Sequence, residues 1–201
     1  MLKSGNKQKV LDLFEREKLV RPKDLEEINV DTKYLYLLLK EGKLKKIGEG
    51  LYTLRDFSID EKFSLVEVSK QIPEGVFCLL TALEFQEMTT QVPHEVWIAL
   101  DNSAYVPKIE SVQLRVVRMS GESLSSGISE YSIEGIPVKI YTPAKTVADC
   151  FKFRNKIGLD IAIEALRDYI QGSYGTLDEL WKYAKICRVQ KIIRPYLEVM
   201  Q

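Results

Sequence analysis

The chain has 201 residues, of which 45% are hydrophobic, and its 29 Lys and Arg balance 29 Asp and Glu. This composition argues against a disordered protein, and the length suits one large domain or two small ones. The single histidine excludes multi-histidine metal sites, and three widely spaced cysteines argue against a disulfide framework or a zinc site. Because no apolar run approaches the roughly 20 residues of a membrane helix, we expect a cytoplasmic protein.

The balanced net charge hides an uneven distribution along the chain. Residues 1–56 hold 13 Lys and Arg against 10 Asp and Glu, so the remainder of the chain is slightly acidic. The excess of basic residues is concentrated between residues 31 and 55, which contain six basic residues and three acidic ones. A local basic bias of this kind is compatible with nucleic-acid binding, although it does not prove it.

Two helices are predicted before residue 30. Apolar residues recur at helical spacing over residues 6–17, which predicts the first helix. The second is expected over residues 21–28, with Pro22 at its first position, where the missing N–H costs nothing.

Residues 32–41 are predicted to form the recognition helix of a helix-turn-helix. Asp31 can accept a hydrogen bond from a backbone N–H of the first turn, and Gly42 follows where helices commonly end in the left-handed region. At about 100° per residue, one face of this helix is apolar and needs a core. The opposite face carries Lys33, Tyr36, Leu37 and Lys40.

A hairpin is predicted directly after this helix. Residues 44–47 and 51–54 resemble short strands, and Gly48, Glu49 and Gly50 between them form a turn signal. Residues 1–56 are therefore predicted to be a winged helix-turn-helix domain, in which the helix can enter the major groove and the wing can lie along the phosphates. The wing adds three candidate DNA-binding residues, Lys43, Lys45 and Lys46. A protein-interaction module of the same shape is the alternative.

Residues 57–201 are predicted to form a second domain of the α+β class, with a mainly antiparallel sheet covered by helices. A Ser-x-x-Glu capping box at Ser58 and Glu61 predicts a helix to about residue 71. Strands are then expected over residues 76–80, 95–100, 113–118, 130–133 and 136–141. Helices are expected over residues 144–154, 159–171, 176–187 and 189–200, the last kinked or split at Pro195.

Several polar residues of this second domain are candidates for catalytic or ligand-binding groups. Lys145 and Asp149 lie one turn apart on the flank of the 144–154 helix, a spacing more typical of an intrahelical ion pair than of a catalytic pair. The basic run of Lys152, Arg154 and Lys156 is expected to be a solvated helix end, with a phosphate or RNA contact as the alternative. No glycine-rich phosphate loop occurs, and no cofactor or metal is predicted.

The order of segments resembles a known family. Residues 75–100, 135–169 and 183–198, and most specifically the sequence YTPAKTVADCFKFR from Tyr141, resemble the AbiEi antitoxins of bacterial abortive-infection systems. Together with the winged helix, the resemblance covers nearly the whole chain. It implies a repressor of its own operon in which Lys33, Tyr36, Lys40, Lys43, Lys45 and Lys46 contact double-stranded operator DNA. It also implies an antitoxin activity in residues 57–201 that counters a co-encoded nucleotidyltransferase toxin.

Two rival functions stay open from the sequence. A metal-dependent nuclease or nucleotidyl-handling enzyme would need acidic residues converging from several strands, whereas the predicted strands carry mainly Val, Ile and Arg. A non-catalytic adaptor would bind a protein partner and never contact DNA. We therefore expect a DNA-binding antitoxin and not an enzyme, with Tyr36 and Leu37 as candidates for contacts with bases.

Overall fold

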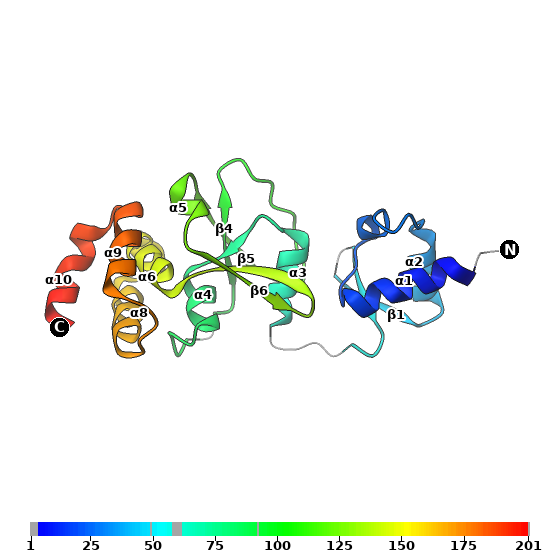
Figure 1. Cartoon of the computed structure of the whole chain (residues 1–201), viewed down its shortest axis with the longest axis horizontal. Coiled ribbons are helices and arrows are strands. Elements are labelled where there is room, and N and C mark those ends of the chain that lie inside the picture. The colour runs from blue at the N-terminus through cyan, green and yellow to red at the C-terminus, as the bar shows by residue number, and fades with distance from the viewer. Residues whose placement is uncertain (1–3, 49, 58–61, 92, 201) are drawn as a thin grey trace. The chain divides into compact units, whose positions relative to one another are not determined.

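The computed structural model describes residues 4–48, 50–57, 62–91 and 93–200 (Figure 1). The chain folds into two compact units. Unit 1 comprises Met1–Pro73, Pro107–Val112 and Ser132–Val138, and unit 2 comprises Glu74–Val106, Gln113–Tyr131 and Lys139–Gln201. The predicted domain boundary after residue 56 lies inside unit 1. Among the described residues, every helix is too short or too polar to cross a membrane.

Unit 1 begins with the predicted winged helix-turn-helix. Its elements are α1 (Ser4–Arg16), the 3-10 helix η1 (Pro22–Leu25), α2 (Lys33–Lys40), β1 (Leu44–Gly48), β2 (Leu51–Leu54) and α3 (Phe63–Gln71). The second helix is shorter than predicted, because only one 3-10 turn forms after Pro22 and Asn29 adopts a positive φ of 51°. The capping box predicted at Ser58 and Glu61 lies outside the described residues.

Two apolar clusters hold unit 1 together. The larger cluster packs α1, η1, α2 and the wing around Phe14, Leu25, Leu35 and Leu38. In the smaller cluster, Leu19, Leu51, Val66 and Ile136 pack together, so that α3 and the start of β7 cover apolar residues of the winged helix. At the centre of each cluster the side chains are almost fully buried, with exposed fractions of 3% or less. Burial of this kind is the main stabilising contribution to a small domain.

A five-stranded sheet has the strand order β5-β4-β3-β7-β6. Its strands are β3 (Val76–Phe77), β4 (Val96–Asp101), β5 (Leu114–Met119), β6 (Ile128–Ile133) and β7 (Ile136–Tyr141). The prediction of a mainly antiparallel sheet is wrong, because β4 pairs with β5 in parallel over six residues and β3 pairs with β7 in parallel. A parallel pair needs a long crossover connection, and the loop between β4 and β5 provides one without a helix. The α+β class itself is confirmed.

Two strand boundaries also have local causes. The first strand is two residues long instead of five, because Leu79 turns to a positive φ of 48° and α4 (Leu79–Phe85) begins there. The β6–β7 turn was predicted at Glu134 and Gly135, and both residues have positive φ values, 51° and 77°. Two consecutive residues in the left-handed region form the hairpin turn that matches strand twist.

The remaining helices lie in unit 2. They are α5 (Glu122–Ser125), α6 (Pro143–Lys152), α7 (Arg154–Ile157), α8 (Leu159–Gln171), α9 (Leu177–Ile186) and α10 (Gln190–Met200). Among them, α7 to α10 contact α6, and α5 lies beside β4 (Figure 1). The predicted helix starts at Thr142–Pro143 and at the Thr176–Glu179 capping box are confirmed. Pro195 lies inside a single helix, α10, which is not split there.

Candidate nucleic-acid interface

The ends of the recognition helix α2 are set by the residues predicted for that role. Asp31 Oδ1 accepts a hydrogen bond from the Lys33 N–H at 2.8 Å, and Gly42 adopts a φ of 72° just after the helix. Tyr34, Leu35 and Leu38 are buried against the core of unit 1. This burial fixes the rotation of the helix and so decides which side chains point outward.

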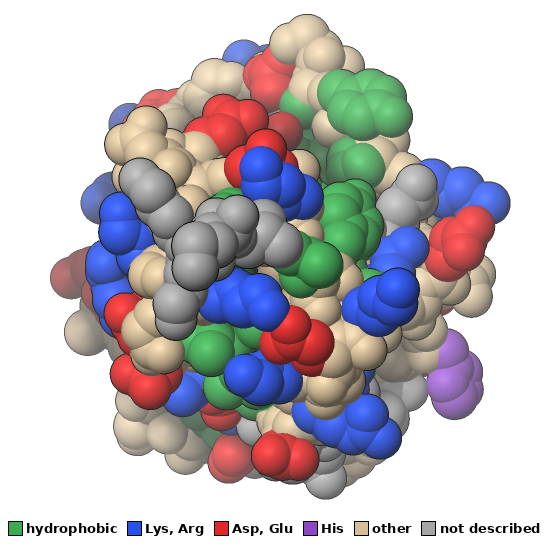
Figure 2. Space-filling view, turned by 90° about the vertical axis from the view of Figure 1, so that its right-hand side faces the viewer, with side chains coloured by type: hydrophobic (Ala, Val, Ile, Leu, Met, Phe, Trp, Pro, Cys, Tyr) green, Lys and Arg blue, Asp and Glu red, His purple; other side chains and the backbone are tan. Residues whose placement is uncertain are grey.

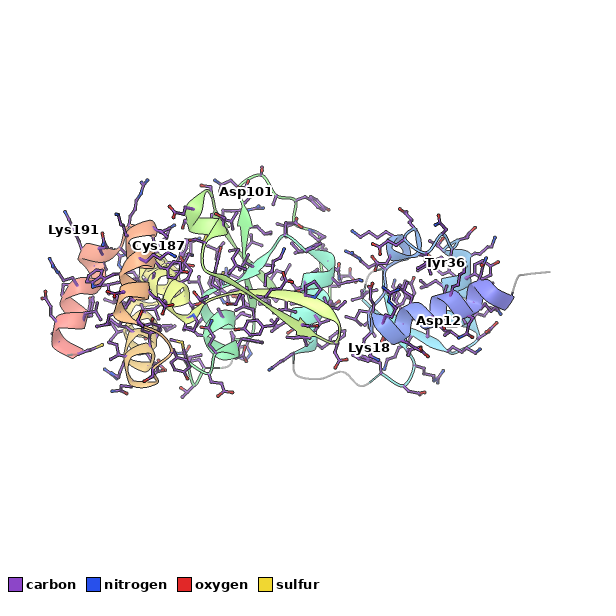
Figure 3. All side chains as sticks on the ribbon, in the orientation of Figure 1. Asp12, Lys18, Tyr36, Asp101, Cys187 and Lys191 are labelled. Atoms are coloured by element: carbon purple, nitrogen blue, oxygen red, sulfur yellow. The ribbon has the colours of Figure 1, made fainter. Side chains whose placement is uncertain are left out.

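Most of the predicted outer face of α2 is exposed. Lys33 and Lys40 are exposed, and Tyr36, labelled in Figure 3, is 53% exposed, an unusual position for a large aromatic side chain. The structure differs for Leu37, which is half-buried and packs against the apolar cluster. The apolar face of this short helix is thus wider than the sequence suggested. Leu37 lies at the edge of that face and packs against the core.

Tyr36 is held in place by the wing. Its ring lies 6.3 Å from the ring of Tyr52 on β2, at an interplanar angle of 85°. An edge-to-face pair of this kind is a favourable aromatic arrangement. Tyr52 itself is buried, and its backbone N–H and carbonyl both pair with Val20 at 3.0 Å. The exposed ring of Tyr36 is thus presented on a fixed support, which the sequence pattern alone did not reveal.

The wing is an antiparallel hairpin with an irregularity between Lys46 and Gly48. Successive side chains of a strand point to opposite faces, so Lys45 and Lys46 cannot share one surface. Lys46 is exposed, whereas the Lys45 ammonium donates a hydrogen bond to the Phe57 carbonyl at 2.7 Å. Lys45 therefore ties the wing to the residues that follow it, although it was predicted beside Lys46.

Charges around α2 are partly paired. Lys33 lies 3.3 Å from Asp31, Lys43 lies 3.9 Å from Glu41, and Lys7 also pairs with Glu41. Within the described part of the chain, Lys40 and Lys46 form no ion pair. Figure 2 shows a face on which Lys and Arg side chains are spread among acidic and hydrophobic ones. Because solvent-exposed ion pairs are weak, the paired lysines can leave their carboxylate partners and bind a phosphate instead.

A partly buried ionic network braces unit 1 behind η1. The Lys70 ammonium on α3 lies 2.9 Å from Asp24 and 2.5 Å from Glu17, and Asp24 also accepts the Arg21 backbone N–H at 2.7 Å. Burial alone would raise the pKa of Asp24, but the Arg21 hydrogen bond and the Lys70 charge outweigh it and lower that pKa. No local sequence pattern indicates this network, because Lys70 is distant from its partners along the chain.

Glu67 on α3 is a second supporting residue that the sequence did not reveal. Its side chain is 1% exposed, and its Oε1 accepts a hydrogen bond from Ser111 at 2.6 Å. Its Oε2 has no hydrogen-bond partner among the described residues, and burial raises the pKa of this carboxyl. The carboxylate also lies directly against Gly48 of the wing, so that any side chain at Gly48 would collide with it.

The candidate catalytic pair of the second domain is an ion pair, as its spacing predicted. Lys145 Nζ lies 2.5 Å from Asp149 Oδ2, and 3.9 Å from the centre of the Tyr141 ring. The predicted position on the helix flank is wrong, since both side chains are 0% exposed. Burial raises the pKa of Asp149 and the Lys145 ammonium opposes that rise. A pair sealed from solvent in this way cannot reach a substrate, which leaves it a structural role.

Potential metal ligands are dispersed over the part of the chain that the structure describes. The described residues contain no group of three or more His, Cys, Asp or Glu side chains placed to hold a metal ion. Cys78, Cys150 and Cys187 are all buried and free, and burial raises the pKa of each thiol. The arrangement that stands out is accordingly the basic, aromatic surface of α2 and the wing.

Comparison with known families decides the class of this winged helix. Residues 8–55 match the family model described as "Transcriptional regulator, AbiEi antitoxin". Residues 8–55 are therefore similar to the AbiEi antitoxin regulators. This match spans the winged helix from α1 through β2, the segment that carries every candidate DNA-binding residue.

Similarity in fold extends further along the chain. A crystal structure of the RV2827C protein from Mycobacterium tuberculosis aligns with a TM-score of 0.58 at 11% sequence identity. The alignment covers 90% of this chain and 71% of that one. At such low identity the similarity establishes the fold alone, and it extends beyond the AbiEi winged helix into the α+β part that follows. No curated protein matches this chain.

Proposed function

We propose that this protein is a DNA-binding transcriptional repressor that also acts as the antitoxin of a bacterial toxin–antitoxin system. In this proposal it represses its own operon in the cytoplasm, and it counters a co-encoded nucleotidyltransferase toxin during abortive infection by phage. The observation that carries the proposal is the exposed basic and aromatic face of α2 on a winged helix that matches the AbiEi family.

The proposed mode of binding places α2 in the major groove and the wing along the phosphates. Lys33, Lys40, Lys43 and Lys46 would neutralise phosphates, because their ammonium groups are exposed. Tyr36 would reach base edges or the sugar–phosphate backbone from its fixed support on Tyr52. We propose only supporting roles for Leu37, which packs inward, and for Lys45, whose ammonium is bound to the Phe57 carbonyl.

We also propose that the two functions are carried by different parts of the chain. We assign DNA binding to residues 1–56 and antitoxin activity to residues 57–201, as the family resemblance implies. A metal-dependent nuclease is the rival for the second part. It finds no support in the arrangement of acidic side chains among the described residues.

DNA binding can be tested by fluorescence anisotropy with the DNA upstream of the protein's own gene. Each phosphate neutralised contributes about −0.9 to the slope of log affinity against log salt, so four lysines predict a slope of about −3.6. The Lys40→Ala/Lys46→Ala variant should reduce the slope by about 1.8. The matched control is Lys191→Ala, which removes an exposed lysine of α10. Absence of binding at low salt, or a slope that the double variant leaves unchanged, would refute this interface.

Toxin neutralisation needs a separate measurement. Bacteria that express the adjacent nucleotidyltransferase gene should survive when this protein is co-expressed from an independent promoter. The Lys40→Ala/Lys46→Ala variant should still protect, since its defect is confined to DNA binding. Failure of the wild-type protein to protect would refute the antitoxin half and leave the repressor half standing.

A further inference from the structure

A basic hollow of about 810 Å³ lies in unit 2, away from the winged helix along the chain. Its wall includes Lys152 at the end of α6, Lys182 and Lys185 on α9, and Arg188 just after α9. Glu122 is the acidic residue that lines it. The lining therefore carries a net positive charge of about three. Basic side chains that converge on a concave surface focus a positive potential there.

One part of the wall is already ordered. The Lys152 ammonium donates a hydrogen bond to Ser123 Oγ at 2.6 Å, which fixes both groups where α5 meets α6. The hydroxyl of Ser123 and the backbone of Gly121, also in the wall, supply polar groups that can bind an oxyanion beside the ammonium. From the sequence, Lys152 is either part of a solvated helix end or a phosphate contact. Its place in this hollow favours the second alternative.

One acidic residue that contacts this lining, Asp149, is already paired. Cys187, labelled in Figure 3 near the end of α9, lines the hollow and donates its S–H to Asp149 Oδ1 at 3.2 Å. The other oxygen of Asp149 is paired with Lys145 at 2.5 Å. Because a buried ammonium already pairs with this carboxylate, Asp149 weakens the attraction of the wall for an anion less than an unpaired carboxylate would.

We propose that this hollow binds the phosphate groups of a small phosphorylated ligand, of the nucleoside triphosphate class. The volume lies within the range of about 300–1,000 Å³ usual for small-molecule sites. Several ammonium and guanidinium groups around one hollow suit the multiple charges of a polyphosphate chain. Since few apolar side chains line it, recognition would come chiefly from the phosphates. The proposal does not depend on DNA binding by α2.

The test is isothermal titration calorimetry on the full-length protein with ATP, inorganic tripolyphosphate and adenosine. ATP and tripolyphosphate should bind and adenosine should not. The Lys182→Ala/Lys185→Ala variant should bind ATP at least tenfold more weakly, as expected when charged hydrogen bonds are lost. Lys191→Ala, which removes an exposed lysine of α10 outside this wall, should bind as the wild type does.

A variant that is expected to bind ATP more tightly makes the test independent of folding defects. Glu122→Gln removes the carboxylate of the wall and should tighten ATP binding several-fold, which an unfolded variant cannot do. The proposal is overturned if neither ATP nor tripolyphosphate binds at millimolar concentration, or if Lys191→Ala weakens binding as much as the double variant. Tighter binding of a single-stranded oligonucleotide than of ATP, lost in the same double variant, would also overturn it and would assign the hollow to a nucleic-acid backbone.

Discussion

The buried ion pair on α6 leads to a quantitative prediction about unit 2. Asp149→Asn would leave the Lys145 ammonium, which is 0% exposed, beside a neutral amide. Removing one partner of a buried pair costs about 3–5 kcal/mol, because an uncompensated charge stays buried. Against a typical free energy of unfolding of about 5–15 kcal/mol, this loss should shift the unfolding transition of unit 2 to a much lower urea concentration.

Urea denaturation followed by tryptophan fluorescence measures this loss in the correct unit. Both tryptophans, Trp97 and Trp181, lie in unit 2, so their emission reports its unfolding. The matched control is Glu198→Gln on α10, which breaks an ion pair with Arg194 at the same i, i+4 spacing. Because those side chains are 68–71% exposed, the control should lose no more than about 0.5 kcal/mol.

A double replacement separates charge from packing. Lys145→Met/Asp149→Leu replaces both charged groups with apolar side chains, so it should recover most of the stability that Asp149→Asn loses. A loss below about 1 kcal/mol for Asp149→Asn, or a double variant less stable than the single one, would refute the reasoning. Either result would mean that Asp149 is not needed to compensate the buried charge of Lys145.

Two further predictions concern single side chains. Gly127→Ala should lose about 1–3 kcal/mol in the same urea titration, because φ is 71° and the new Cβ would lie 2.8 Å from Lys145 and 2.9 Å from Tyr183. The control Gly121→Ala, also in unit 2 and at a φ of 56° but in open space, should lose less. Burial raises the pKa of Glu67 above its ordinary 4.5, so wild-type stability should fall as the pH rises from 4.5 through the folded-state pKa. Because the Glu67→Gln side chain cannot ionise, this variant should become more stable relative to the wild type as the pH rises through that range. Melting temperatures measured from acid to neutral pH test this. If the melting temperatures of the two proteins change with pH in the same way, the explanation is wrong.

Local signals made the winged helix predictable. The hydrogen bond that Asp31 accepts and the left-handed conformation of Gly42 are decided within one turn of chain, and they were predicted where they occur. The same holds for the hairpin turn at Glu134 and for the helix start at Thr142. In each case the residue type restricts the backbone directly, so neighbouring residues suffice for the prediction.

Features that depend on distant partners could not be predicted. The parallel pairing of β4 with β5 is set by the path of a loop that contains no helix, and the alternation of apolar residues is the same for either direction. The spacing of Lys145 and Asp149 predicted their ion pair, yet their burial depends on helices later in the chain that cover α6. Glu67 showed no signal, because its contacts with Ser111 and Gly48 join segments far apart in sequence.

The discontinuous composition of unit 1 bears on how such proteins can diversify. The chain leaves this unit after Pro73 and returns to it at Pro107–Val112 and again at Ser132–Val138. Ile136, from the last of these segments, packs on Leu19 and Leu51 of the winged helix. Exchange of the first 56 residues between relatives would therefore transfer the surface that we propose to bind DNA without part of its hydrophobic support. Under that proposal, a change of DNA specificity should arise more readily by substitutions on the surface of α2 than by recombination of whole domains.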